Sequence, residues 1–334
     1  MAICKALRLT FIAAILCACS TNSSTPIPAF GSVPTITLET PIHGQSTLSP
    51  VSILNQTPGP TKTSLISISA SKQPLAIKVT ATFNPNSWQY LPIIPTPSKR
   101  VLEIYLHGIE MGNNPKAFSK IGDCGSTPTW FLGDFDRGTR FYNLGNYQYL
   151  DKVIAYYSGS FNRTSLAAQS GFNASSVLTP LWADRSQCLT NETPLACEYR
   201  IHKPILAFIT MGANDVYHLD SFEPQMRQII EYSIDHGVIP VLSTKPDNIE
   251  KDNRINITIA KLAYEYQVPL WNFWLAVQSL PNHGLQEDGV HLTWSANQFE
   301  NPDVFNWGWP VRNLTALHAL DSIFDYLSEH SASP

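Results

Sequence analysis

The chain has 334 residues, with 22 basic and 26 acidic side chains and a formal net charge of -4. This balance provides no basic surface suited to nucleic acid, so nucleic-acid binding is excluded as a leading function. The length allows one or two domains, but about the first seventy residues cannot contribute a core, and one folded domain is the economical interpretation.

Residues 1–18 predict a secretory signal peptide. Lys5 and Arg8 precede an apolar stretch that is too short to span a bilayer. The segment Leu16-Cys17-Ala18-Cys19 resembles a bacterial lipoprotein cleavage site, which implies that Cys19 becomes the lipidated first residue of the mature chain. The lipid would anchor the protein at the extracellular face of a bacterial membrane without spanning it. An ordinary signal peptide, cleaved just before Cys19, is the alternative.

Residues 19–73 are dominated by Ser, Thr and Pro and carry few charges. Such a composition buries too little apolar surface to offset the entropy of ordering, and its prolines keep the chain extended. We therefore expect a tether at 19–73 and a folded domain at 74–334. The alternation of Ile and Ser at 66–69 leaves open a short strand at the edge of that domain.

The folded part alternates helical and strand signals. Alternation of this kind predicts an α/β fold: a single three-layer α/β/α domain, with a parallel sheet covered by helices on both faces. Helices are expected at 97–112, capped by Thr96, and at 146–158, 222–236, 254–266 and 311–327. Strands are expected at 117–121, 205–211, 238–242 and 268–273.

Polar motif residues follow two of these strands. Cys124 comes shortly after the first strand, and Asn214 directly follows the strand at 205–211. In open α/β sheets, ligands bind outside the carboxyl ends of the strands. Asp288 and His291 are three residues apart, so both side chains fall on one side of a turn. The carboxylate can then hold one imidazole nitrogen while the other faces a nucleophile.

Four segments, in this order, resemble the blocks of the GDSL-type (SGNH) hydrolases. They are Gly122-Asp123-Cys124, the isolated Gly171, Gly212-Ala213-Asn214-Asp215, and Asp288-Gly289-Val290-His291. The resemblance covers the chain from about residue 117 onward and implies an SGNH or flavodoxin-like fold. The family carries a serine nucleophile at the position of Cys124.

The resemblance implies a role for each matched residue. Cys124 would be the nucleophile, His291 the base and Asp288 the group that orients it. The backbone N–H groups of Cys124 and Gly171, with the Asn214 side-chain amide, would form the oxyanion hole. No cofactor is implied.

Two interpretations of Cys124 stay open. An unperturbed thiol has a pKa of about 8.5, which an imidazolium or a helix N-terminus lowers, so Cys124 is chemically able to act as a nucleophile. Sulfur is larger than oxygen, however, and a misplacement of about 1 Å can cost about 100-fold in rate. The alternative is a small apolar cysteine in a site that only binds. Ser126 is a substitute candidate nucleophile, although a helix cap is the more usual role at such a position.

The remaining cysteines bear on redox state. Cys188 and Cys197 flank a polar loop that a disulfide would close in an oxidising exterior, which leaves Cys124 as a thiol. A bridge to Cys124 is the less favoured alternative, because the other two are neighbours in sequence. His283 with the Asp288–His291 pair is a rival metal site, but no metal-binding spacing supports it and we expect no metal.

The sequence therefore predicts a surface-anchored SGNH-type hydrolase that acts on carboxylic esters, with O-acetylated glycans as candidate substrates, through an acyl-enzyme on Cys124. The aromatic residue most readily placed at the site mouth is Trp294, three residues beyond His291, because aromatic faces suit sugar rings. The alternative function is a catalytically inactive SGNH-fold protein that binds an extracellular carbohydrate or a cell-wall component.

Overall fold

The computed structural model describes residues 83–331. These residues belong to the second of two units into which the chain divides, Met1–Leu75 and Ala76–Pro334. The predicted signal peptide, the lipidated Cys19, the tether and the short strand at 66–69 lie outside the described residues. Within the described part, none of the helices has both the length and the apolar character needed to cross a bilayer.

A parallel sheet forms the centre of the domain. Its four strands lie in the order β1-β3-β4-β5 and pair in parallel throughout. Their bounds are β1 (Asn114–Gly122), β3 (Pro204–Thr210), β4 (Ile239–Ser243) and β5 (Leu270–Trp271). Nearly all of β3 and β4 is buried, as expected of strands covered on both faces. A separate parallel pair joins β2 (Tyr142–Asn143) to β6 (Asn297–Gln298).

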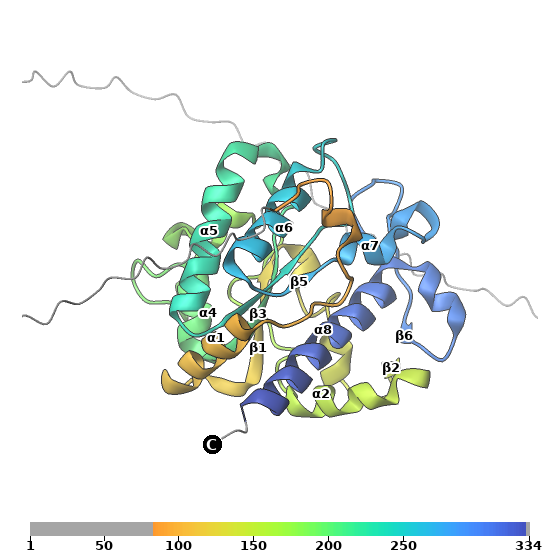
Figure 1. The fold of residues 1–334 in the computed structure, drawn as a ribbon, viewed down its shortest axis with the longest axis horizontal. Coiled ribbons are helices and arrows are strands. Elements are labelled where there is room, and N and C mark those ends of the chain that lie inside the picture. Colours follow the sequence, from red (N-terminus) through yellow and green to blue (C-terminus); the bar gives the residue numbers. More distant parts are fainter. Residues whose placement is uncertain (1–82, 332–334) are drawn as a thin grey trace, which may run out of the picture. The chain divides into compact units, whose positions relative to one another are not determined.

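The helices pack in two groups on this sheet, which confirms the predicted α/β class (Figure 1). One group consists of α1, α2 and α7 around α8, and the other of α3, α4, α5 and α6. Their bounds are α1 (Lys99–Glu110), α2 (Asp151–Tyr156), α3 (Ala174–Val177), α4 (Pro194–His202), α5 (Leu219–Asp235), α6 (Arg254–Tyr266), α7 (Phe273–Val277) and α8 (Gly308–His330). Helix α6 has the predicted bounds, because apolar residues recur on one face along its whole length.

Several predicted elements differ in extent. Helices α5 and α8 and strand β1 are longer than the predicted 222–236, 311–327 and 117–121. Three further differences have a local cause. Helix α1 begins after Ser98, whose hydroxyl accepts from the Arg100 N–H at 3.2 Å, and not after Thr96. The helical pattern at 146–158 is split, because Tyr147 has non-helical backbone angles and a 3-10 helix (Gly145–Leu150) precedes α2. The last strand is short, because Asn272 caps α7 and the chain turns into that helix at once.

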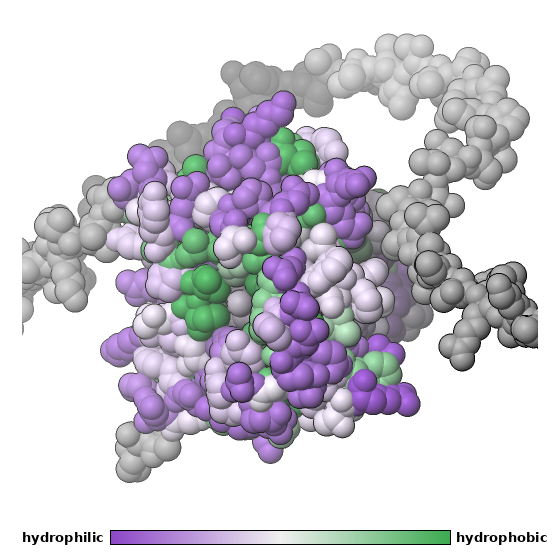
Figure 2. Space-filling view, turned by 90° about the vertical axis from the view of Figure 1, so that its right-hand side faces the viewer, coloured by the Kyte–Doolittle hydropathy of each residue, from purple (hydrophilic) through white to green (hydrophobic). Residues whose placement is uncertain are grey.

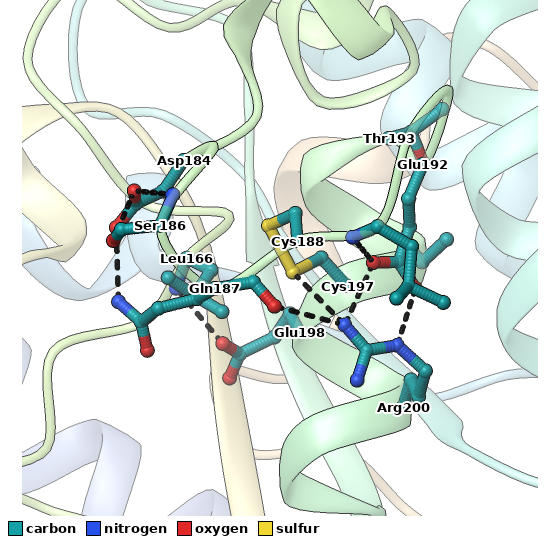
Figure 3. Close-up of a disulfide and its surroundings, with 12 residues drawn as sticks. Leu166, Asp184, Ser186, Gln187, Cys188, Glu192, Thr193, Cys197, Glu198 and Arg200 are labelled. Atoms are coloured by element: carbon teal, nitrogen blue, oxygen red, sulfur yellow. Dashed lines mark hydrogen bonds and ion pairs between the residues drawn. A yellow bond between two sulfur atoms is a disulfide. The ribbon is translucent and has the colours of Figure 1, made fainter.

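The predicted polar loop between Cys188 and Cys197 is only partly a loop, because Thr193 caps α4 and Cys197 lies within that helix. The two cysteines form a disulfide, with their Cα atoms 5.3 Å apart (Figure 3). Arg200 of α4 reaches back to the loop and contacts the Glu192 carboxylate at 2.7 Å. The favoured pairing is therefore present, and the Cys124 thiol is left at the end of β1.

On the face shown in Figure 2, hydrophilic residues predominate and hydrophobic residues gather in a few small groups. The core is one main cluster of buried apolar side chains, with rings packed edge to face, such as Phe118 on Phe208 and Phe131 on Phe208. This core fixes the strands whose carboxyl ends carry the motif residues.

Candidate active site

Cys124 lies at the start of a tight turn beyond the carboxyl end of β1. The Asp123 carboxylate accepts from the Gly125 N–H at 2.8 Å, and a 3-10 helix, η2 (Cys124–Ser126), begins there. The Thr127 hydroxyl donates to the Cys124 carbonyl at 2.8 Å. Both ends of the turn are thus hydrogen-bonded, and Cys124 itself is half-buried.

Gly122 and Ser126 form the packed base of this turn. The Ser126 side chain is fully buried, and its hydroxyl bonds to the Thr210 hydroxyl at the end of β3. A Cβ atom on Gly122 would overlap both hydroxyl oxygens, so only glycine fits at this position. Neither role considered for Ser126 is present: it is buried away from any substrate, and it caps no helix.

The Asp288–His291 pair forms as its spacing predicts. The Asp288 Oδ2 atom lies 2.6 Å from His291 Nδ1, and Oδ1 accepts from the backbone N–H groups of Val290 and His291 at 2.9 Å each. Burial acts to raise the pKa of Asp288, but the hydrogen bond from His291 and the two backbone N–H groups outweigh it and lower this pKa. Both side chains are about half exposed, at 47% and 56%. The Asp288 carboxylate therefore fixes which imidazole nitrogen faces outward.

The loop that carries this pair is held against the N-terminus of α8. The Thr293 hydroxyl accepts from the Gly308 N–H at 2.9 Å, and the Trp309 N–H donates to the Thr293 carbonyl at 3.0 Å. Burial raises the pKa of Asp123, while Arg312 of α8, the Gly125 N–H and His291 act to lower it. His291 therefore lies within electrostatic range of the turn that carries Cys124.

The segment that leads to Gly171 is held against the end of β1 by backbone hydrogen bonds. The Gly122 N–H donates to the Ala167 carbonyl at 3.1 Å, and the Gln169 N–H donates to the Gly122 carbonyl at 3.2 Å. Gly171 follows in an exposed position, with a φ of 82° and open space beside its Cα. Its left-handed backbone suits glycine.

Asn214 reaches across to this segment from the end of β3. Its side-chain amide donates to the Phe172 carbonyl at 2.9 Å, which leaves a second amide hydrogen for another acceptor. Asp215 anchors the turn, because its carboxylate accepts from the Ala174 N–H at 2.9 Å and from the Gly212 N–H at 3.0 Å. Burial raises the pKa of Asp215 despite these two donors.

Arg312 is a site residue that the sequence analysis did not single out. It is 9% exposed, and the Nε atom has no hydrogen-bond partner among residues 83–331. Burial lowers the pKa of its guanidinium to about 10, while Asp123 and Cys124 act to raise it. Arg312 lies in the first half of α8, where successive residues from Gly308 to Leu314 are buried. A charged residue there gives no local signal of burial, since arginine is usually exposed.

The rival metal site does not form. His283 Nδ1 contacts the Gln278 carbonyl at 3.1 Å and lies outside any cluster with the Asp288–His291 pair. In the described part of the chain, the one group of potential metal ligands consists of Cys188, Glu192 and Cys197, whose two sulfurs form the disulfide.

No protein-family model matches the sequence, and no curated protein matches it either. Solved structures with a similar chain arrangement include a GDSL-like lipase from Bacteroides thetaiotaomicron, which is 16% identical, with 66% of this chain and 98% of that chain covered and a TM-score of 0.39. A psychrotrophic esterase from a Pseudoalteromonas species is 16% identical over 64% and 99% of the two chains, with a TM-score of 0.38. A catalytic mutant of an acetylxylan esterase from Geobacillus stearothermophilus is 15% identical over 61% and 93%, with a TM-score of 0.39. Likenesses at this level carry no inference about activity.

Proposed function

We propose that this protein is a hydrolase of carboxylic esters in which Cys124 is the nucleophile, His291 the base and Asp288 the group that orients the base. The observation that carries the proposal is the use of both Asp288 oxygens. One oxygen holds His291 Nδ1 and the other holds the backbone of the same loop. A site that only binds its ligand has no need of an imidazole oriented in this way.

The reaction would proceed in two steps. The Cys124 sulfur, having given its proton to His291, attacks the ester carbonyl carbon, and a carbon–sulfur bond forms. The carbon–oxygen bond then breaks, and the alcohol leaves with the proton from His291. A water molecule, deprotonated by His291, attacks the thioester and releases the carboxylic acid, and the sulfur recovers its proton.

The proposed oxyanion hole consists of the backbone N–H groups of Cys124 and Gly171 and the second amide hydrogen of Asn214. These groups come from the ends of β1 and β3 and from the segment that bonds to Gly122. Each such donor is typically worth about 3 kcal/mol of barrier. Asp215 holds the Asn214 turn through backbone bonds and so keeps this donor in position.

Three exposed aromatic side chains, close in sequence to proposed site residues or packed on a residue next to one, favour a glycan as the part of the substrate that is bound. Trp294 follows His291 by three residues and is 60% exposed. Tyr217 ends η6 (Asp215–Tyr217), beside Asn214, and is 80% exposed, and Trp182, 53% exposed, packs on Phe172 with ring centroids 6.2 Å apart. The apolar faces of sugar rings pack on such side chains, which supports O-acetylated glycans as candidate substrates.

We also propose that the chain is anchored outside the cell through a lipid on Cys19. The supporting observations are the signal-like segment at 1–18 and the Cys188–Cys197 disulfide, since disulfides persist in oxidising compartments. Globomycin, which blocks lipoprotein signal cleavage, tests this directly. We expect a larger precursor with the inhibitor, and an unchanged mass would contradict the anchor.

Hydrolysis of p-nitrophenyl acetate and of acetylated xylan by the full chain tests the function, with Cys124→Ala and His291→Ala alongside. We expect turnover in the native protein, loss in both variants, and an acetyl adduct on the Cys124 peptide after acid quenching. Xylan binding without turnover or adduct would instead support the non-catalytic carbohydrate-binding alternative.

A further inference from the structure

Arg312 lies in an aromatic box beneath the Cys124 turn. Its guanidinium carbon lies 4.9 Å from the ring centroid of Phe131, 5.3 Å from Trp309, 5.4 Å from Phe273 and 5.9 Å from Trp271. Burying a guanidinium among apolar rings is costly unless nearby groups compensate the charge. Cation–π attraction supplies part of the compensation, since it strengthens when the cation is desolvated.

The guanidinium points to the turn itself. A Cβ atom placed on Gly125 would lie 3.4 Å from Arg312 Nη1 and 3.1 Å from Asp123 Oδ1, so both groups lie against the residue that follows Cys124. Arg312 interacts electrostatically with two groups of this turn, Asp123 and Cys124. The cation therefore lies against the residue that follows Cys124 in the turn.

We propose that Arg312 is a positioning residue whose buried positive charge stabilises the thiolate form of Cys124 from beneath the turn, while His291 acts on it from the exposed side. The inference rests on the proposed function, because it assigns Arg312 a role in activating the proposed nucleophile. A charge in a poorly solvated position acts strongly and is little screened by salt. An opposite charge within about 4–6 Å lowers an acid's pKa by about 1–3 units.

Other charged groups that face the turn set the background for this effect. Asp123 belongs to the turn and competes with Cys124 for the Arg312 charge, and Asp215 acts on Asp123 from η6. His291, with Asp288 bonded to it, approaches from the loop before α8. Removing the negative charge of Asp123 should therefore shift the alkylation midpoint of Cys124 in the opposite direction from removing the positive charge of Arg312.

The test is the pH dependence of Cys124 alkylation by iodoacetamide in the full chain, read from the mass of the Cys124 peptide. We expect Arg312→Met to raise the pH midpoint by about one unit, which is about a tenfold lower rate well below the midpoint. Arg312→Lys retains a cation and should keep most of the native midpoint. Asp123→Asn, nearly isosteric, should lower the midpoint. The plateau rate at high pH should stay within about twofold, because the sulfur is equally accessible.

A folded Arg312→Met protein with the native midpoint would overturn the proposal. Where Arg312→Met does not fold, Arg312→Gln keeps a polar group of similar length in the box and serves in its place with the same expectation. Parallel measurements on His291→Ala separate the two inferences. If the alkylation midpoint shifts in His291→Ala but in no Arg312 variant, the proposed role of Arg312 is wrong and the proposed role of His291 is not affected. If the alkylation midpoint stays the same in His291→Ala but shifts in Arg312→Met, His291 is not the base, and the effect of Arg312 on Cys124 still holds.

Discussion

The two sides of the candidate site differ in burial. The Asp288–His291 loop is half exposed and is held by its own backbone bonds and by Thr293. The Cys124 turn is instead packed on the core: its own Ser126 is fully buried and bonds to Thr210 of β3, and Arg312 of α8 is buried against it. Because of this difference, replacing the exposed His291 should cost little stability, whereas replacing the buried residues that pack against the Cys124 turn should destabilise the core.

The largest expected effect comes from the exposed side. His291→Ala should lower kcat/KM by about 100-fold to 10000-fold, the usual contribution of a general base, while the Tm stays within about 2 °C. Initial rates on p-nitrophenyl acetate and calorimetry of the same samples check both parts. His283→Ala, a nearby histidine outside the pair, is the matched control and should leave the rate unchanged. A large fall in Tm in His291→Ala would contradict the difference between the two sides.

The buried side should respond in the opposite way. Gly122→Ala places a methyl group against the Ser126 and Thr210 hydroxyls, and we expect it to cost about 3 kcal/mol of unfolding free energy. Gly112→Ala is the control: its Cβ meets nothing within 4 Å, and its φ of 79°, unlike the backbone of Gly122, is left-handed, so about 1 kcal/mol of backbone strain is expected and no packing cost. Urea titration measures both, and equal costs would show that packing at Gly122 is unimportant.

The disulfide contains none of the proposed site residues, and we expect its removal to affect stability alone. Replacing Cys188 and Cys197 together by alanine opens a loop with a sequence separation of 9 and should cost about 2.5 kcal/mol. Esterase kcat should be unchanged within about twofold. The double variant avoids leaving one reactive thiol. If the double variant folds but loses ester hydrolysis, the loop closed by the disulfide contributes to the site, and this would contradict the prediction.

The strand that leads to Cys124 should impose a pH dependence on stability. Burial lowers the pKa of Lys120 to about 7, and its ammonium donates to the Phe161 carbonyl at 2.7 Å. The pKa of Lys120 is lower in the folded than in the unfolded chain. Between these two pKa values the unfolded chain binds more protons, so the free energy of unfolding rises with pH from about 7. We expect a gain of about 2 kcal/mol from about pH 7 to pH 9. Lys120→Met should remove this slope, and an equal slope in the variant would contradict the assignment.

Patterns that are local in sequence predicted much of this molecule. The apolar face of 254–266 and the continuous apolar run at 205–211 correspond to α6 and β3, with boundaries within one residue. The Asp288–His291 contact followed from its spacing, because a turn of four residues brings such a pair together.

Features that depend on distant contacts were not predictable in this way. The local sequence around Arg312 does not show that the rings of Phe131, Trp271 and Phe273 meet its guanidinium from outside α8. The Ser126 hydroxyl was considered as a nucleophile because the sequence does not show that Thr210 meets it across β1 and β3. Such outcomes depend on the packing of the whole fold, which overrides local propensity.

The most direct test of the central claim is the alkylation rate of Cys124 at about pH 6, compared between the native full chain and His291→Ala. A thiolate paired with an imidazolium reacts well below the pH at which an unperturbed thiol does. We predict fast labelling in the native protein and a fall of at least about tenfold in His291→Ala. Slow labelling in the native protein, or labelling that is equal in the two proteins, would contradict the account of Cys124 as a nucleophile activated by His291.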